Sequence, residues 1–431
     1  MKLRTFNLWI RQVALTPVMR VCTPQLFFLA ALWRKLLFRT TFIAITGSVG
    51  KTTTKELLAD ILASRGRTYR SRGNQNNGRA VPLNVLRVRP WHRFAVLEVG
   101  IAEPGQMVRS ARVIRPDVAI ILTILRTHAK TFKDFDLYAA DKAVLLKWMA
   151  PGGLAVLNAD DIRVAAMSAS AETRVRFTGS SPDFHLWIDQ VYGRWPERLR
   201  FRAHCGEEVY EIQTQLVGCH WAAMLAAALA AARELGVPLA DAAAVLRNSK
   251  PYTARLEPVV LPHGPIVIRD DYKTTTAGFE ASLLVLREAE ANRKVLVISN
   301  IADGIPHKRW MRQMAEEVSG WVGLLVLIGE DHMYARRRAI EAGMAPDNVH
   351  AFGSLKEAAD FLRRELRSGD VTLLKGRTTD HIARLYFAQL GTVNCWREHC
   401  PKTMLCDSCW ELGFHPDSAQ NSELVSLRNW R

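Results

Sequence analysis

The chain of 431 residues lacks the features that mark several classes of protein. The longest apolar cluster in its first forty residues spans 26–33, far short of the ~20 residues that a membrane-spanning helix needs. No small-residue cleavage site follows this cluster, so a cleaved signal peptide is not expected. Cysteine is scarce, with seven residues, which argues against a disulfide framework and favours a reducing compartment.

Acidic residues are absent from one end of the chain. No Asp or Glu precedes Glu56, whereas residues 1–40 carry seven Lys and Arg among apolar clusters. This segment has two interpretations: a basic segment lying on a membrane surface, or short helices, divided at Pro17 and Pro24, that pack on the body of the protein. The membrane anchors of the first interpretation would be Phe6, Trp9, Phe27 and Trp33.

The composition that is present is that of an ordinary globular protein. Hydrophobic residues make up 48% and charged residues 23%, and about 150 residues per domain predicts two or three domains. Lys and Arg total 58 against 42 Asp and Glu, a formal net charge of +16. This excess favours acidic partners: nucleotides, nucleic acid or an anionic membrane face.

A phosphate-binding loop follows a short strand-like run at residues 42–45. Residues 46–54 read TGSVGKTTT, and a helical pattern with one apolar face comes next. In a strand–loop–helix unit of this kind, backbone N–H groups at the helix N-terminus hold phosphates. Lys51 would reach the outer phosphates and the Thr52 hydroxyl would bind magnesium. The expected nucleotide contacts are Gly47, Ser48, Val49, Gly50, Lys51, Thr52 and Thr53.

This loop has two residues between its glycines where the common pattern has four, and in that it resembles the Mur ligase family of ATP-dependent amide-forming ligases. The similarity is greatest to the MurF type, which adds D-alanyl-D-alanine to a UDP-muramoyl tripeptide. Further segments resemble the family in the right order, and together they cover roughly residues 41–390. These segments are 76–78, 82–83, 96–100, 120–123 with His128, 139–143, 157–161, 218–220, 255–257, 270–272 and 373–376.

The resemblance implies a two-stage reaction. A substrate carboxylate attacks the γ-phosphate of ATP, and an amine then attacks the acyl phosphate to form the amide. Thr52 and Glu98 would hold one magnesium ion; His128 and Lys142 would hold a second, with Lys142 carbamylated because a free ammonium cannot bind a cation. The implied catalytic residues are Lys51, Glu98, His128 and Lys142, and the implied nucleotide contacts include Arg255 and Asp271.

Each of these residues also has a purely structural interpretation, which the sequence leaves open. Glu98 could lie on the surface at a strand end, and His128 could be a hydrogen-bonded structural histidine. Lys142 could be a solvated lysine on its helix. Asp271 could cap a helix, and Arg255 could form an ion pair at the joint between domains.

Three departures from the MurF pattern concern the substrate. MurF-type enzymes carry an N-terminal domain that holds the uridine nucleotide, and only 45 residues precede the loop here. The family's Tyr-Asn-Ala-Asn-Pro run is replaced by YKTTT at residues 272–276, and the stretch before His128 reads TILRT, with Lys130 where an acidic residue is common. These departures predict a relative that uses a non-standard carboxylate and needs no UDP-linked substrate.

Four of the seven cysteines lie close together near the C-terminus, at Cys395, Cys400, Cys406 and Cys409. Four thiolates suit tetrahedral zinc, which would clip the C-terminal domain shut. An iron–sulfur cluster, a site in which His399 replaces one thiolate, and unbound thiols are the alternatives. The tail has no dense basic run, so nucleic acid is not the expected partner.

The predicted architecture is α/β. A central P-loop ATP-binding domain with a mostly parallel sheet spans 41–252, and a smaller Rossmann-like domain spans 253–392, flanked by the segment 1–40 and a Cys-rich tail, 393–431. The strands of the Rossmann-like domain are expected at 266–268, 294–299, 323–328 and 371–375.

The predicted function is cytoplasmic, ATP- and Mg²⁺-dependent amide ligation between a small-molecule or peptide carboxylate and an amine, with peripheral contact at the inner membrane as an option. A cell-wall ligase of the MurF type, a γ-glutamyl ligase, an ATP-binding scaffold and an NTPase acting on nucleic acid are the alternatives.

Overall fold

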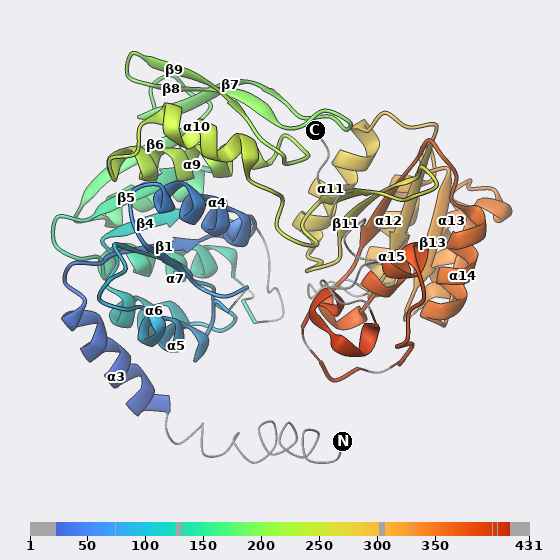
Figure 1. Cartoon of the computed structure of the whole chain (residues 1–431), viewed down its shortest axis with the longest axis horizontal. Helices are drawn as coiled ribbons and strands as arrows, with labels where there is room; N and C mark the ends of the chain where they lie inside the picture. The colour runs from blue at the N-terminus through green and yellow to red at the C-terminus, as the bar shows by residue number, and fades with distance from the viewer. Residues whose placement is uncertain are drawn as a thin grey trace.

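The computed structural model describes residues 23–73, 75–125, 131–132, 134–300, 307–329, 331–398, 400–402 and 404–413. They form two lobes that the chain crosses between residues 248 and 257 (Figure 1). Both lobes are α/β with mostly parallel sheets, as the sequence predicts. Among the described residues, no helix has the length and apolar character needed to cross a bilayer.

The first lobe is built on a sheet with the strand order β2-β3-β1-β4-β5-β6-β7-β8-β9. Neighbours from β2 to β7 pair in parallel, and β7, β8 and β9 pair antiparallel at one edge. Its strands are β1 (Thr41–Thr46), β2 (Thr68–Arg70), β3 (Phe94–Glu98), β4 (Val118–Ile121), β5 (Leu154–Asn158), β6 (Arg174–Gly179), β7 (Leu186–Tyr192), β8 (Arg200–Cys205) and β9 (Glu208–Gln213).

Helices cover both faces of this sheet. The helices are α3 (Thr23–Leu36), α4 (Lys51–Ala63), α5 (Ala80–Arg87), α6 (Gln106–Ile114), α7 (Phe135–Lys147), α8 (Ile162–Ala166), α9 (Trp221–Glu234) and α10 (Leu239–Asn248). In β1, Ile43 and Ile45 belong to the apolar cluster under α4 and α9, while Phe42 and Ala44 belong to the cluster under α5, α6 and α7. Successive side chains of a strand point to opposite faces, so a fully apolar strand between two helical layers buries both.

Helix α9 packs against α4 and lies next to the phosphate loop. Eleven of its residues, from Trp221 to Ala232, are buried, and most of them are alanine. Small side chains let this helix approach strands β4 to β7 closely. This alanine-rich helix therefore forms part of the core of the first lobe.

The second lobe has a sheet with the order β10-β11-β15-β12-β13-β14, in which only the β10–β11 pair is antiparallel. Its strands are β10 (Glu257–Val260), β11 (Ile266–Asp270), β12 (Arg293–Ile298), β13 (Leu324–Ile328), β14 (Val349–Phe352) and β15 (Asp370–Lys375). Its helices are α11 (Thr276–Glu288), α12 (His307–Val318), α13 (His332–Glu341), α14 (Leu355–Glu365) and α15 (Ala383–Leu390).

Candidate active site

A cavity of about 590 Å³ lies where the two lobes face each other. The first lobe contributes the phosphate loop, the end of β3 and a lysine of α7, and the second lobe contributes the segment after β11, the start of α11 and the end of β15. We call the residues from the first lobe the phosphate wall: Lys51, Thr52, Glu98 and Lys142. We call those from the second lobe the facing wall: Arg255, Asp270, Lys273, Ser282 and Lys375.

Two glycines shape the phosphate loop. Gly50 has φ +80° at the start of α4, and a Cβ there would lie 2.0 Å from Sδ of Met224 on α9. A Cβ on Gly47, where φ is +149°, would lie 2.9 Å from Cβ of Leu122. Only glycine combines this backbone conformation with so close an approach. The loop therefore holds its N–H groups in a fixed position at the helix N-terminus, as a phosphate cradle requires.

Lys51 curls back over the loop it follows. Its Nζ donates to the carbonyl oxygens of Gly47 at 2.7 Å and Ser48 at 3.2 Å. Burial, and next the charge of Lys142, lower the pKa of Lys51 to about 7. The lowered pKa indicates that the residues around Lys51 supply little negative charge. A bound anion would favour the charged form of the lysine.

Glu98 and Thr52 meet at the end of β3. The Thr52 hydroxyl donates to Glu98 Oε2 at 2.8 Å, and Asn76 Nδ2 donates to Oε1 at 2.5 Å. Glu98 is 2% exposed, which rules out the surface interpretation. A hydroxyl and a carboxylate oxygen beside a phosphate loop are the ligands that Mg²⁺ prefers, so these residues fit the ion.

Lys142 reaches the same loop from α7. Its Nζ donates to the Gly47 carbonyl at 3.1 Å, contacts Thr46 Oγ1 at 3.5 Å and lies 4.8 Å from the centre of the Tyr138 ring. Lys142 is 1% exposed, so it is not a solvated lysine. Burial, and next the charge of Lys273, lower its pKa to about 7. A neutral amine is what carbamylation needs, so the environment fits that modification.

The remaining predicted residues fall differently. Arg255 lines the cavity, and its guanidinium lies 4.5 Å from the centre of the Tyr272 ring. His128 lies outside the described residues. His220 belongs to the family-like segment 218–220 but was given no site role, and it lines the cavity, where burial lowers its pKa to about 4. Its place just before α9 gave no signal of a catalytic role.

Asp271 requires a correction. It does not line the cavity; both of its carboxylate oxygens accept from Arg269, at 3.1 and 3.0 Å, inside the second lobe. Asp270 faces the cavity instead, where its Oδ2 accepts from Lys375 and, at 2.5 Å, from Ser282. Neighbouring residues at the end of a strand point to opposite sides, so only one of the two aspartates can face the cavity.

Arg269 connects this part of the site to the Cys-rich tail. Its side chain is fully buried and makes two contacts with Asp407, at 2.6 and 3.0 Å, in addition to those with Asp271. The ring centres of Tyr386 and Phe387 lie 4.8 and 5.6 Å from the guanidinium. The tail is thus part of the second lobe's buried interior.

The four tail cysteines line one small cavity with His381, but they are not arranged as a metal site. Among residues 23–413, as far as they are described, no group of three or more His, Cys, Asp or Glu side chains could hold a metal ion. Cys406 Sγ lies 3.4 Å from His381 Nδ1, and burial raises the pKa of Cys406 to about 11. The described side chains thus do not support the expected zinc ion, which would need several ligands gathered around one point.

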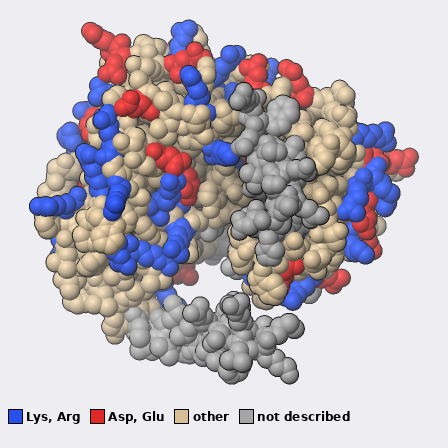
Figure 2. Space-filling model, in the orientation of Figure 1, with Lys and Arg blue, Asp and Glu red and all other residues tan. Residues whose placement is uncertain are grey.

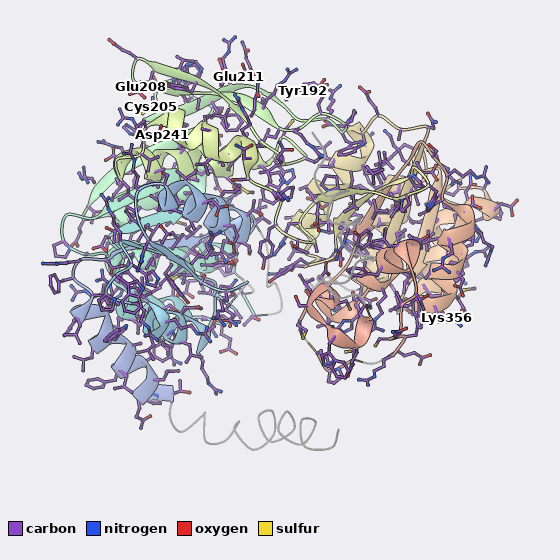
Figure 3. The ribbon with its side chains drawn as sticks, in the orientation of Figure 1. Tyr192, Cys205, Glu208, Glu211, Asp241 and Lys356 are labelled. Carbon is purple, nitrogen blue, oxygen red and sulfur yellow. The ribbon has the colours of Figure 1, made fainter. Side chains whose placement is uncertain are left out.

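The surface away from the cavity has a different character. On the face shown in Figure 2, Lys and Arg are interspersed with Asp and Glu over both lobes, which does not resemble a continuous nucleic-acid track. Figure 3 places Tyr192 and Glu211 on the outer, antiparallel strands of the first lobe and Lys356 on the far side of the second. None of these three residues lines the cavity.

Comparison with known sequences and structures agrees with this geometry. Residues 45–232 match the Mur ligase middle domain, and residues 254–378 match the domain described as Mur ligase, glutamate ligase domain. The chain is 29% identical over 378 residues to the UDP-N-acetylmuramoyl-tripeptide–D-alanyl-D-alanine ligase of Mycobacterium tuberculosis, covering 82% of this chain and 74% of the relative. It is 28% identical over 265 residues to the Escherichia coli enzyme of that name, covering 61% and 58%.

Solved structures show the same similarity. MurF from Acinetobacter baumannii superposes with a TM-score of 0.77 at 25% identity, covering 84% of this chain and 79% of that one. MurF ligase from Thermotoga maritima, solved in complex with ADP, superposes with a TM-score of 0.73 at 20% identity, covering 85% and 83%. At 20% identity, the match to the Thermotoga maritima structure shows the shared fold alone.

Proposed function

The chain belongs to the Mur ligase family, and from that premise we propose that the cavity between its lobes is where ATP, a carboxylate and an amine meet. The protein is a MurF-like ATP-dependent ligase that forms a carbon–nitrogen bond. The observation that carries the site assignment is the phosphate wall: Lys51, Thr52, Glu98 and Lys142 converge on one loop.

We assign the residues of the phosphate wall as follows. The N–H groups of residues 47–53 and the Lys51 ammonium bind the β- and γ-phosphates, and Thr52 with Glu98 holds Mg²⁺. When bound, the ion neutralises charge that develops on the transferring phosphoryl group. Lys142, as a carbamate, would orient the substrate carboxylate with a second ion, and His128 is proposed as its partner.

The facing wall would hold the other end of the nucleotide and the substrates. Asp270 is fixed by Ser282 and by Lys375, which lies at the end of β15. Asp270 therefore presents a rigid polar edge to the cavity. Lys273 lines the cavity close enough to lower the pKa of both Lys51 and Lys142. The family has an asparagine-containing run at this position, so an added cation here supports a carboxylate substrate different from that of the curated relatives.

Phosphate release provides the test of this function. Purified protein with ATP, Mg²⁺ and a panel of peptide carboxylates and amines should release phosphate only when both organic substrates are present. The pair named by the relatives, UDP-muramoyl tripeptide and D-alanyl-D-alanine, belongs in the panel, and we expect it to turn over poorly. Efficient ligation of that pair would refute the substrate proposal while confirming the ligase. No release with any pair would favour an ATP-binding scaffold.

A structural zinc ion in the tail remains a prediction based on the spacing of its cysteines and on the small cavity they share. The arrangement of the side chains does not fit the ion, so no step of the reaction is assigned to it. Elemental analysis of protein purified without added metal decides between the spacing and the arrangement: one zinc per chain would support the prediction made from the spacing. Iron in equal amount, or no metal, would contradict the prediction.

We further propose that the protein works in the cytoplasm and contacts the inner membrane at its periphery through the N-terminal segment. Two of the anchors expected there, Phe27 and Trp33, pack against the first lobe. The other two, Phe6 and Trp9, lie outside the described residues. Among the described residues, the exposed side chains of α3 are the candidates for this contact.

A further inference from the structure

Helix α3 is held on the first lobe by one of its faces. Trp33 Nε1 donates to the Val88 carbonyl at 2.9 Å, and Arg34 Nε donates to the Ile114 carbonyl at 2.8 Å. The Arg34 guanidinium also pairs with Asp117 at 3.0 Å. Ala30 on the same face is fully buried. These bonds fix both the position and the rotation of the helix beside α5 and α6 (Figure 1).

The opposite face of α3 is apolar and exposed. Phe28, Leu32 and Leu36 follow each other at intervals of four residues and are 69%, 48% and 60% exposed. Leu29 lies beside them, and Phe38 in the turn after the helix is also exposed. A helix packed on a globular protein normally turns polar side chains outward. The outward face of α3 reverses that rule.

This concentration is not matched elsewhere among the described residues. The other large apolar side chains with similar exposure, such as Ile162, Leu284 and Met333, come from separate elements. Single exposed apolar side chains are normal on a protein surface, whereas a contiguous group marks a contact site. The face of α3 thus has the character of a binding surface.

The charges around this face are of one sign. Lys35 is exposed on the helix, and Arg39 is exposed in the turn after it, with its guanidinium 5.7 Å from the centre of the Phe38 ring. No acidic residue precedes Glu56. Arg109 and Arg112 are exposed on the neighbouring helix α6, and Asp117, the acid nearest the helix in these contacts, is already paired with Arg34. An apolar helical face bordered by Lys and Arg is complementary to an anionic lipid surface.

We propose that α3 and the turn after it form a membrane-docking surface, with Phe28, Leu29, Leu32, Leu36 and Phe38 entering the boundary between headgroups and acyl chains. Lys35 and Arg39 would lie at the level of the anionic headgroups. Because the same helix is bonded to the first lobe through Trp33 and Arg34, the catalytic body would be held at the membrane without a flexible connection. This inference does not depend on which substrates the ligase uses.

Vesicle co-sedimentation of the full chain tests the proposal. The double variant Phe28→Ser/Leu32→Ser is compared with Leu284→Ser/Met333→Ser. This control replaces two large apolar side chains of comparable exposure in the second lobe. With vesicles of phosphatidylcholine and phosphatidylglycerol, we expect the α3 variant to bind at least about tenfold more weakly and the control to bind like the parent. Vesicles of phosphatidylcholine alone, or high salt, should weaken binding of the parent.

Three results would overturn the proposal. The first is equal vesicle binding by the α3 variant and the parent. The second is loss of binding on deletion of residues 1–22 with no effect of the α3 substitutions. The third is a parent chain that is dimeric by light scattering and becomes monomeric in the α3 variant, because a second copy would then cover this face. Circular dichroism and ATP-dependent phosphate release, unchanged in the variant, show that it is folded.

Discussion

The two walls of the cavity handle their charges in opposite ways. On the phosphate wall, Lys51 and Lys142 bond to backbone carbonyls and a hydroxyl, and burial lowers the pKa of both to about 7. Across the cavity and behind it, Lys375 is paired with Asp270, and Arg269 with Asp271 and Asp407. Burying a cation is costly unless an anion accompanies it. The phosphate wall therefore favours binding of an anionic ligand, whereas the cations of the second lobe already have carboxylate partners.

This difference separates two roles that buried charges have in one site. Removing a lysine from the phosphate wall should lower activity but change the free energy of unfolding little, because folding gives that lysine no anionic partner. Removing a cation from the second lobe's network should cost stability, since it leaves buried carboxylates unpaired. Four predictions test whether the distinction holds.

The largest effect is expected for Lys51→Ala. Loss of the ammonium that faces the outer phosphates should lower kcat by about 10²–10³-fold, the range measured when one group that stabilises developing charge is removed. The urea unfolding midpoint should stay close to that of the parent. Lys147→Ala, an exposed lysine on α7, is the matched control and should be fully active. Full activity of Lys51→Ala would mean that the loop has another role.

Arg269→Met tests the opposite behaviour. The substitution leaves Asp271 and Asp407 buried without their cation, so the free energy of unfolding should fall by about 3–5 kcal/mol. Arg287→Met on α11 removes an exposed ion pair with Glu317 on α12 and should cost less than about 1 kcal/mol. Urea denaturation measures both. Equal values for the two variants would show that the buried network contributes no more than a surface pair.

Lys142→Ala should lower kcat by about 10²-fold, and short carboxylates added to the assay should restore part of the activity if a carbamate is the working group.

The folded-state pKa of Lys142, about 7, sets the pH dependence of carbamate formation. The amine is neutral and reactive toward carbon dioxide above that pH, and protonated below it. Carbon-13 NMR with labelled bicarbonate should therefore show a carbamate signal that is lost as the pH falls through this range; a signal independent of pH would contradict the assignment.

The smallest effect is expected for Lys273→Asn, which restores the residue type found in the family. Its charge lowers the pKa of Lys51 and Lys142, so its removal should raise both and shift the carbamate signal to higher pH. The KM for ATP or for the carboxylate should change roughly two- to fivefold, as for a partly exposed charge. Lys308→Asn, an exposed lysine on α12, should change neither. An unchanged pH profile would place Lys273 too far from the phosphate wall to matter.

Much of the phosphate wall could be predicted because its signals are local. The glycine positions, Lys51 and Thr52 lie close together in one strand–loop–helix unit. Glu98 and Lys142 were assigned through the resemblance of segments 96–100 and 139–143 to the Mur ligase family. The four strands expected in the second lobe are present as β11, β12, β13 and β15. The edge strands β10 and β14 were not predicted, since short strands of four residues with partly exposed side chains have weak patterns.

The facing wall and the tail were harder to predict. Asp270 and Asp271 are adjacent in the sequence, and the alternation of the strand decides which one faces the cavity. The link from Arg269 to Asp407 joins residues 138 positions apart, which no local pattern records. Similarly, Phe27 and Phe28 differ in role only because of the direction in which α3 is rotated against the lobe.

The amino-acid sequence by itself determined the order of the elements, the phosphate loop and the chemical types available to the site, because strand and helix periodicity and glycine conformation are properties of short segments. Tertiary structure alone decided which lysines lost their water, which aspartate faces the cavity and which side of α3 remains exposed. Desolvation and pairing depend on groups brought together from distant parts of the chain, so the pKa of Lys142 and the partner of Arg269 exist only in the folded protein.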